Sequence, residues 1–107
     1  MILQDLQPKS IWKNFELINA VPRPSKKEER IIQFMIDFGK QLGLETETDS
    51  VGNVLIRKPA TAGMEDRQTV VLQSHLDMVH QKNSHTVFDF ETQGIQMYVD
   101  GDWVRAK

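Results

Sequence analysis

The sequence predicts an α/β fold, with two amino-terminal helices packed on a mixed sheet of about five strands. Two early segments carry apolar residues at helical spacing, and later segments alternate between β-prone runs and turn-rich clusters. Residues 69–72 form a continuous run of β-branched and apolar residues that is typical of a buried strand. A length of 107 residues corresponds to one small domain or to part of a larger one.

The first helix is predicted over about residues 8–20. Ile11, Phe15 and Ile18 fall on one face at helical spacing. Prolines at positions 22 and 24 end this helix, because the residue before a proline is pushed out of the helical region.

A second helix is predicted to follow Ser25. Ser25 and Glu28 match a capping box, in which the serine hydroxyl and the glutamate satisfy main-chain amides at the helix start. Its apolar stripe consists of Ile31, Met35, Phe38 and Leu42. Gly43 is expected to end the helix in a left-handed conformation.

The predicted strands follow this second helix. Residues 45–48 and 54–58 form a hairpin, residues 68–75 form a buried strand, and residues 86–90 are a short extended piece. A second hairpin is expected from residues 95–99 and 103–106, because Asp100-Gly101-Asp102 between β-prone runs is a hairpin signal.

The composition excludes several classes of protein. With 39% hydrophobic and 26% charged residues, the chain is expected to fold, and a net charge of −2 offers no footprint for nucleic acid or an anionic membrane. No apolar run approaches the roughly 20 residues of a membrane helix, and the first residues do not form a secretory signal. There is no cysteine, which excludes disulfides and thiolate chemistry. A cytoplasmic location is therefore expected.

The candidate site is His75-Leu76-Asp77, at the end of the predicted strand 68–75. Residues two apart on a strand project to the same side, and open α/β sheets bind ligands at the carboxyl ends of their strands. A neutral imidazole on a rigid strand end is a good zinc ligand. Asp77 could ligate the metal or hold the His75 ring through its other nitrogen, and the spacing favours the second role. A capped strand end without function is the structural alternative.

Other chemistry is less well supported by the sequence. There is no Gly-x-Ser-x-Gly elbow and no phosphate-binding glycine loop, and Ser74 is expected to point away from His75. His80 and His85 flank a polar loop and are interpreted as solvated side chains rather than metal ligands.

Longer segments resemble a known family. They are Val51-Gly52-Asn53, residues 56–65, His75-Leu76-Asp77-Met78-Val79, Gln81-Lys82-Asn83 and Asp100-Gly101-Asp102-Trp103-Val104. They resemble the amino-terminal part of the co-catalytic zinc aminopeptidases and carboxypeptidases. The most similar family is that of the bacterial aminoacyl-histidine dipeptidases, also called Xaa-His or cytosol non-specific dipeptidases.

This resemblance implies that residues 1–107 are the amino-terminal portion of a metallopeptidase catalytic domain, without its lid domain. It implies hydrolysis of Xaa-His and other unblocked dipeptides, with His75 as a ligand to one of two zinc ions and Asp77 as the catalytic-site aspartate that orients it. A homodimer is implied for the full-length protein. His80 stands where the family has a proline, so it inherits no role. Since the remaining ligands are absent, the chain alone is expected to be inactive and to bind zinc weakly.

Two alternatives remain at this stage. His75 and Asp77 would serve a tripeptidase, an acylase or a carboxypeptidase of the same superfamily equally well. The chain could instead be a non-catalytic module that self-associates through an exposed sheet edge.

Overall fold

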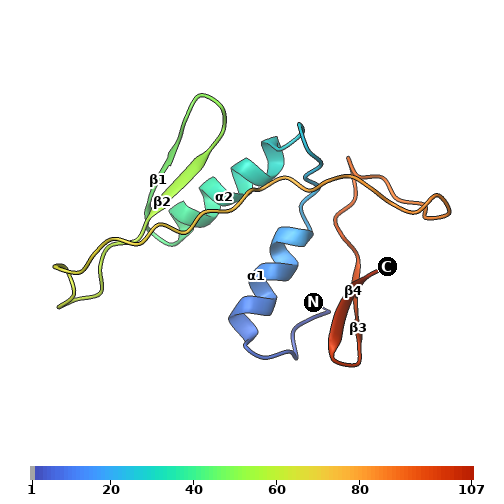
Figure 1. The fold of residues 1–107 in the computed structure, drawn as a ribbon, viewed down its shortest axis with the longest axis horizontal. Helices are drawn as coiled ribbons and strands as arrows, with labels where there is room; N and C mark the ends of the chain where they lie inside the picture. The colour runs from blue at the N-terminus through green and yellow to red at the C-terminus, as the bar shows by residue number, and fades with distance from the viewer. Residues whose placement is uncertain (1) are drawn as a thin grey trace. The chain divides into compact units, whose positions relative to one another are not determined.

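The structure of the chain is a computed structural model that describes residues 2–107. Its helices and strands, in chain order, are α1 (Lys9–Asn19), α2 (Glu29–Gln41), β1 (Glu45–Thr48), β2 (Val54–Arg57), β3 (Met97–Asp100) and β4 (Trp103–Ala106) (Figure 1). The chain divides into two compact units, which are described separately. The first unit contains the chain up to Ile31 together with Asp77–Lys107, and the second contains Ile32–Leu76.

In the first unit, the end of α1 is tied to the segment that leads into β3. The main-chain N–H of Ile95 donates to the Asn19 carbonyl at 2.8 Å. Asn19 is only 4% exposed, and its side-chain nitrogen lies 3.3 Å from the Met97 sulfur. The same side chain accepts a hydrogen bond from the Arg23 guanidinium at 2.9 Å. The polar groups of Asn19 therefore have hydrogen-bond partners, and they connect the end of α1 to the segment that leads into β3.

Gly94 allows this close approach of two main-chain segments. A β-carbon at position 94 would lie 2.5 Å from the Ala20 carbonyl oxygen and 2.7 Å from that of Asn19. Because main-chain atoms cannot swing aside, Gly94→Ala is expected to lower the free energy of unfolding by about 1–3 kcal/mol. Urea denaturation measures this loss. Gln96→Ala, at an exposed position nearby, should stay within about 0.5 kcal/mol, and equal losses for both variants would contradict the steric explanation.

In the second unit, α2 lies against the hairpin of β1 and β2. A β-carbon on Gly39 would lie 2.2 Å from the Thr46 hydroxyl oxygen and 3.2 Å from the Ile56 side chain, so the missing side chain permits the contact. The predicted end of the helix is confirmed: Gly43 has φ +70°. The Gly43 N–H donates to Lys40 O at 2.9 Å and the Leu44 N–H to Gly39 O at 3.0 Å, which satisfies two terminal carbonyls.

Both predicted hairpins are confirmed. β1 and β2 pair in antiparallel fashion with Thr46 opposite Ile56, and β3 and β4 pair with Val99 opposite Val104. The Asp49 carboxylate closes the first turn by accepting from the Val51 N–H at 3.0 Å and the Asn53 N–H at 2.9 Å. Its hydrogen bond from the Asn53 side chain is the main cause of the lowered pKa of Asp49.

The α/β class is confirmed, but the predicted strand count and the single mixed sheet are wrong. The described residues form four strands in two separate antiparallel pairs. Residues 68–75 have no strand structure, and all of them are exposed. Residues 86–90 contain no strand either. A strand exists only where another segment satisfies its main-chain groups, and neither hairpin nor the Pro24–Met78 bridge includes residues 68–74.

The hydrophobic core of the described chain is small. Its buried hydrophobic residues are Leu3 at 1%, Ile31 at 0% and Met97 at 5% exposure. At the amino terminus, the Glu16 carboxylate accepts from the main-chain N–H groups of Ile2 and Leu3 at 2.7 and 3.2 Å, which holds Leu3 inside. Neither helix of the described chain combines the length and apolar character needed to cross a membrane.

Candidate functional site

Asp77 is held in the first unit by a short main-chain pairing. Pro24 and Met78 form a parallel bridge, in which the Met78 N–H donates to Arg23 O at 2.8 Å and the Ser25 N–H to Met78 O at 3.1 Å. This bridge brings Ser25 alongside Asp77. The Ser25 hydroxyl then donates to an Asp77 carboxylate oxygen at 2.5 Å. A charge-assisted hydrogen bond of this kind fixes the direction of the half-buried carboxylate.

Arg23 adjoins this bridge and supplies positive charge that interacts with Asp77. Partial burial lowers the pKa of the Arg23 guanidinium, and its attraction to the Asp77 carboxylate opposes that shift. A guanidinium keeps its proton in proteins, so the Asp77 carboxylate lies within the field of a permanent cation. The Ser25 hydroxyl and the Arg23 guanidinium therefore both interact favourably with the Asp77 carboxylate.

The predicted capping box at Ser25 is wrong. α2 begins at Glu29, and the chain first makes a turn in which the Lys27 N–H donates to Pro24 O at 2.9 Å. This turn separates the Ser25 side chain from the first helical amides. Glu28 accepts instead from the Lys26 N–H at 2.5 Å, and the Ser25 hydroxyl is used by Asp77.

His75 lies in the second unit and is exposed. The strand end that was expected to position His75 is not formed, since residues 68–75 have no strand structure. The structure therefore brings Asp77 together with Ser25 and Arg23, while His75 belongs to the other unit. Within residues 2–107, no group of three or more His, Asp or Glu side chains is arranged to hold a metal ion.

The two remaining histidines are also exposed. The His80 ring contacts the Phe90 ring edge-on, with centroids 6.1 Å apart and planes at 66°. Phe90 in turn packs edge-on against Phe88 at 4.9 Å. His80 is thus an aromatic packing partner, and His85 lines a cavity in the same unit.

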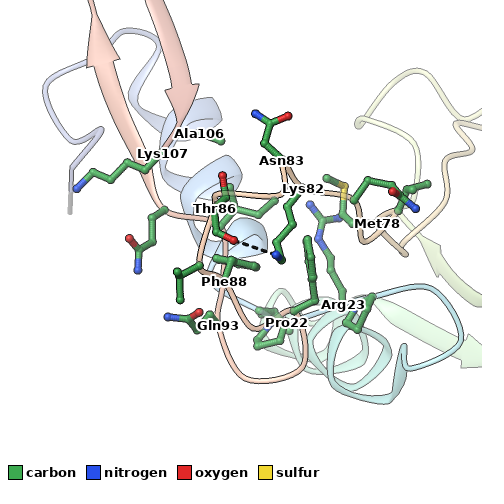
Figure 2. A pocket seen from close by; sticks show the side chains of 18 of the residues that line it. Pro22, Arg23, Met78, Lys82, Asn83, Thr86, Phe88, Gln93, Ala106 and Lys107 are labelled. Atoms are coloured by element: carbon green, nitrogen blue, oxygen red, sulfur yellow. Dashed lines mark hydrogen bonds between the residues drawn. The ribbon is translucent and has the colours of Figure 1, made fainter.

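This cavity has a volume of about 630 Å³ and lies between residues 21–24, the loop 78–90 and the end of β4 (Figure 2). Its charged lining side chains are Arg23, Lys82 and Lys107, and no described lining residue is acidic. Lys82 donates to the Thr86 carbonyl at 2.9 Å, as the dashed line in Figure 2 shows. No sequence pattern predicts this cavity, because the loop that builds it has no regular periodicity.

The chain was compared with known proteins. No protein-family model matches it. It is 51% identical over 105 residues to the cytosol non-specific dipeptidase of Escherichia coli strain K12, which covers 98% of this chain. Its structure matches the crystal structure of aminoacylhistidine dipeptidase from Vibrio alginolyticus with a TM-score of 0.93 and 46% identity over 98% of this chain.

The predicted resemblance to the aminoacyl-histidine dipeptidases is confirmed. The match extends over nearly the whole chain in both sequence and fold. The chain spans 22% of the length of the Escherichia coli dipeptidase and 21% of the Vibrio alginolyticus dipeptidase. The similarity therefore concerns about a fifth of each dipeptidase.

Sequence reasoning missed Ser25 and Arg23 in this dipeptidase-like chain. Ser25 was assigned to a local helix cap, and Arg23 was not singled out. Ser25 donates a hydrogen bond to the Asp77 carboxylate, 52 residues later in the chain, and the Arg23 guanidinium attracts the same carboxylate. No local pattern reports such a pair, since only the folded chain brings the two segments together.

Proposed function

We propose that the protein to which this chain belongs is a zinc-dependent dipeptidase that hydrolyses Xaa-His and other unblocked dipeptides. The observation that supports this most strongly is the similarity to two dipeptidases, at 51% and 46% identity over 98% of the chain. In this proposal, residues 1–107 form the amino-terminal portion of a metallopeptidase catalytic domain. The full-length protein is a cytoplasmic homodimer.

The proposed site residues are His75 as a zinc ligand and Asp77 as the catalytic-site aspartate that orients it. The donor set fits zinc, because imidazole nitrogen and carboxylate oxygen are both ordinary zinc ligands. Zinc would supply Lewis acidity and a water of lowered pKa at such a site. Two donors cannot complete a tetrahedral site, so the other ligands must come from residues beyond this pair.

The role of Asp77 is supported by the way this chain holds it. A carboxylate that orients a histidine ring must itself be fixed and ionised. The 2.5 Å hydrogen bond from Ser25 fixes one carboxylate oxygen, and the Arg23 guanidinium attracts the carboxylate. In this proposal, Ser25 and Arg23 are positioning residues that act through Asp77.

The full-length protein and the 107-residue chain are expected to differ in zinc affinity and in zinc-dependent activity. A complete structural zinc site contributes ~10–16 kcal/mol of apparent binding, which one imidazole and its neighbouring carboxylate cannot approach. The full-length protein should therefore hydrolyse dipeptides, lose activity with a chelator and regain it with zinc. The 107-residue chain should show no hydrolysis and only weak zinc binding by calorimetry. Zinc-dependent hydrolysis by the purified 107-residue chain would contradict this.

A substrate panel distinguishes the related enzyme classes. His75 and Asp77 would serve a tripeptidase, an acylase or a carboxypeptidase equally well. Only the rates at which the full-length protein hydrolyses different substrates can therefore distinguish these enzyme classes. The full-length protein is expected to cleave free dipeptides, including Xaa-His, faster than tripeptides and N-acylated amino acids. A preference for either of the last two would replace the dipeptidase assignment with another member of the superfamily.

A further inference from the structure

Asn19, the last residue of α1, has a polar side chain although the residue is only 4% exposed. Burying an amide costs free energy unless its polar atoms find partners, and an apolar side chain of similar size would pack in the same place without that cost. The packing of α1 therefore does not by itself require an asparagine at this position.

The two partners of the Asn19 amide differ in strength. Its nitrogen lies 3.3 Å from the Met97 sulfur, and a thioether is a weak acceptor. Its oxygen accepts from an Arg23 guanidinium nitrogen at 2.9 Å, and a hydrogen bond from a charged donor is roughly twice as strong as one between neutral groups. The stronger hydrogen bond of the buried amide is therefore the one that it makes with Arg23.

Arg23 is held through both its main chain and its side chain. The Arg23 carbonyl accepts from the Met78 N–H at 2.8 Å, which places the residue beside the segment that carries Asp77. An arginine side chain has many rotamers, so this main-chain bond alone does not fix the direction of the charge. The hydrogen bond to Asn19 fixes that direction, and the guanidinium held in this way attracts the Asp77 carboxylate.

We propose that Asn19 is a positioning residue of the proposed zinc site, because its side-chain oxygen holds the Arg23 guanidinium where it attracts the Asp77 carboxylate. Asn19 acts on Arg23, and Arg23 acts on the carboxylate that orients His75. The role rests on the proposed function, since it requires a zinc ion held by His75. A purely structural Asn19 would only join the end of α1 to the segment that leads into β3.

The zinc affinity of the full-length protein tests this role. It is measured on the metal-free protein by competition for zinc with a chromophoric chelator, which needs no substrate. Asn19→Leu keeps the approximate size of the side chain and removes its oxygen. Zinc affinity should therefore fall by about 2–10-fold, less than the roughly 10–100-fold loss typical of a group that itself orients a metal-binding histidine.

A double-mutant cycle separates action through Arg23 from a general loss of stability. Arg23→Met removes the guanidinium and keeps a long side chain. In this background, Asn19→Leu should change zinc affinity by less than about twofold, because the group that Asn19 positions is absent. The double variant replaces both hydrogen-bond partners with apolar groups, which limits the cost to the fold. Additive losses of zinc affinity from the two substitutions would overturn the proposed role.

Met97→Leu is the matched control. It removes the sulfur that accepts from the same buried amide and keeps the hydrogen bond between Asn19 and Arg23. Thermal unfolding should therefore occur at a lower temperature, whereas zinc affinity should stay within about twofold of that of the unsubstituted protein. Equal losses of zinc affinity for Met97→Leu and Asn19→Leu would show that Asn19 acts only on the fold, and would overturn the proposed role.

The same measurements distinguish a failure of this role from a failure of the proposed function. If Asp77→Ala lowers zinc affinity and Asn19→Leu does not, the zinc site stands and Asn19 has no part in it. If the unsubstituted full-length protein binds no zinc, the proposed function itself is wrong, and the role of Asn19 fails with it.

Discussion

Ile31→Ala is expected to lower the free energy of unfolding of the 107-residue chain by about 2–5 kcal/mol. Ile31 has 0% exposure, and the described chain buries only two other hydrophobic residues to a similar degree, Leu3 and Met97. Removing its side chain loses the transfer free energy of the buried carbons and leaves a cavity. A typical domain has a net stability of about 5–15 kcal/mol, so this loss is a large fraction of the total.

Denaturant unfolding followed by tryptophan fluorescence measures this effect, since Trp12 lies in α1 and Trp103 in β4. Two variants serve as controls. Ile31→Val removes one methyl group and should cost about 0.5–1.5 kcal/mol. Ile11→Ala makes the same chemical change at a side chain that is 61% exposed and should stay within about 0.5 kcal/mol. Similar losses at positions 11 and 31 would show that burial of Ile31 does not hold the fold.

The elements that could be predicted from sequence are those whose cause is local. The first helix, the two hairpins and the end of α2 at Gly43 depend on residues within a few positions of one another. Apolar spacing, turn residues and a glycine that tolerates positive φ are visible in a linear sequence. These elements form as predicted because their stabilising contacts lie within each segment or its immediate neighbour.

The predictions that failed depend on distant partners. Residues 68–75 have the pattern of a buried strand, but the pattern reports only a tendency to be buried and paired. The described strand pairs do not include residues 68–74, so the strand does not form. Ser25 and Glu28 match the capping-box pattern, yet the Ser25 hydroxyl bonds to a carboxylate 52 residues later. The bond that Ser25 donates to the Asp77 carboxylate is charge-assisted and stronger than one accepted from a neutral main-chain N–H, and the position of that carboxylate cannot be read from the sequence.

Only the part of the candidate site that is local in sequence could be predicted. His75 and Asp77 could be singled out because they are two residues apart in the chain. The contribution of Arg23 and Ser25 to the surroundings of Asp77 appears only in the structure, through the bridge between Pro24 and Met78. This bridge, rather than a regular strand, determines where Asp77 lies.

Asp77→Ala in the full-length protein is expected to lower zinc affinity or kcat/KM by roughly 10–100-fold, the range typical of carboxylates that orient a metal-binding histidine. The substitution removes the negative charge that Ser25 and Arg23 hold in place. Zinc content by metal analysis and dipeptide hydrolysis measure the loss. An unchanged rate together with an unchanged zinc content would remove Asp77 from the site.

Ser25→Ala separates the proposed role of Asp77 from a purely structural one. This variant keeps the carboxylate and the Arg23 charge but removes the 2.5 Å hydrogen bond that directs one oxygen. If Asp77 only stabilises the bridge between Pro24 and Met78, both variants should lower the free energy of unfolding of the 107-residue chain while the full-length protein keeps its zinc. If Asp77 orients a zinc ligand, Asp77→Ala should lose zinc to a much greater extent than Ser25→Ala. The ratio of the two zinc affinities therefore decides whether the carboxylate acts on the metal site or on the fold.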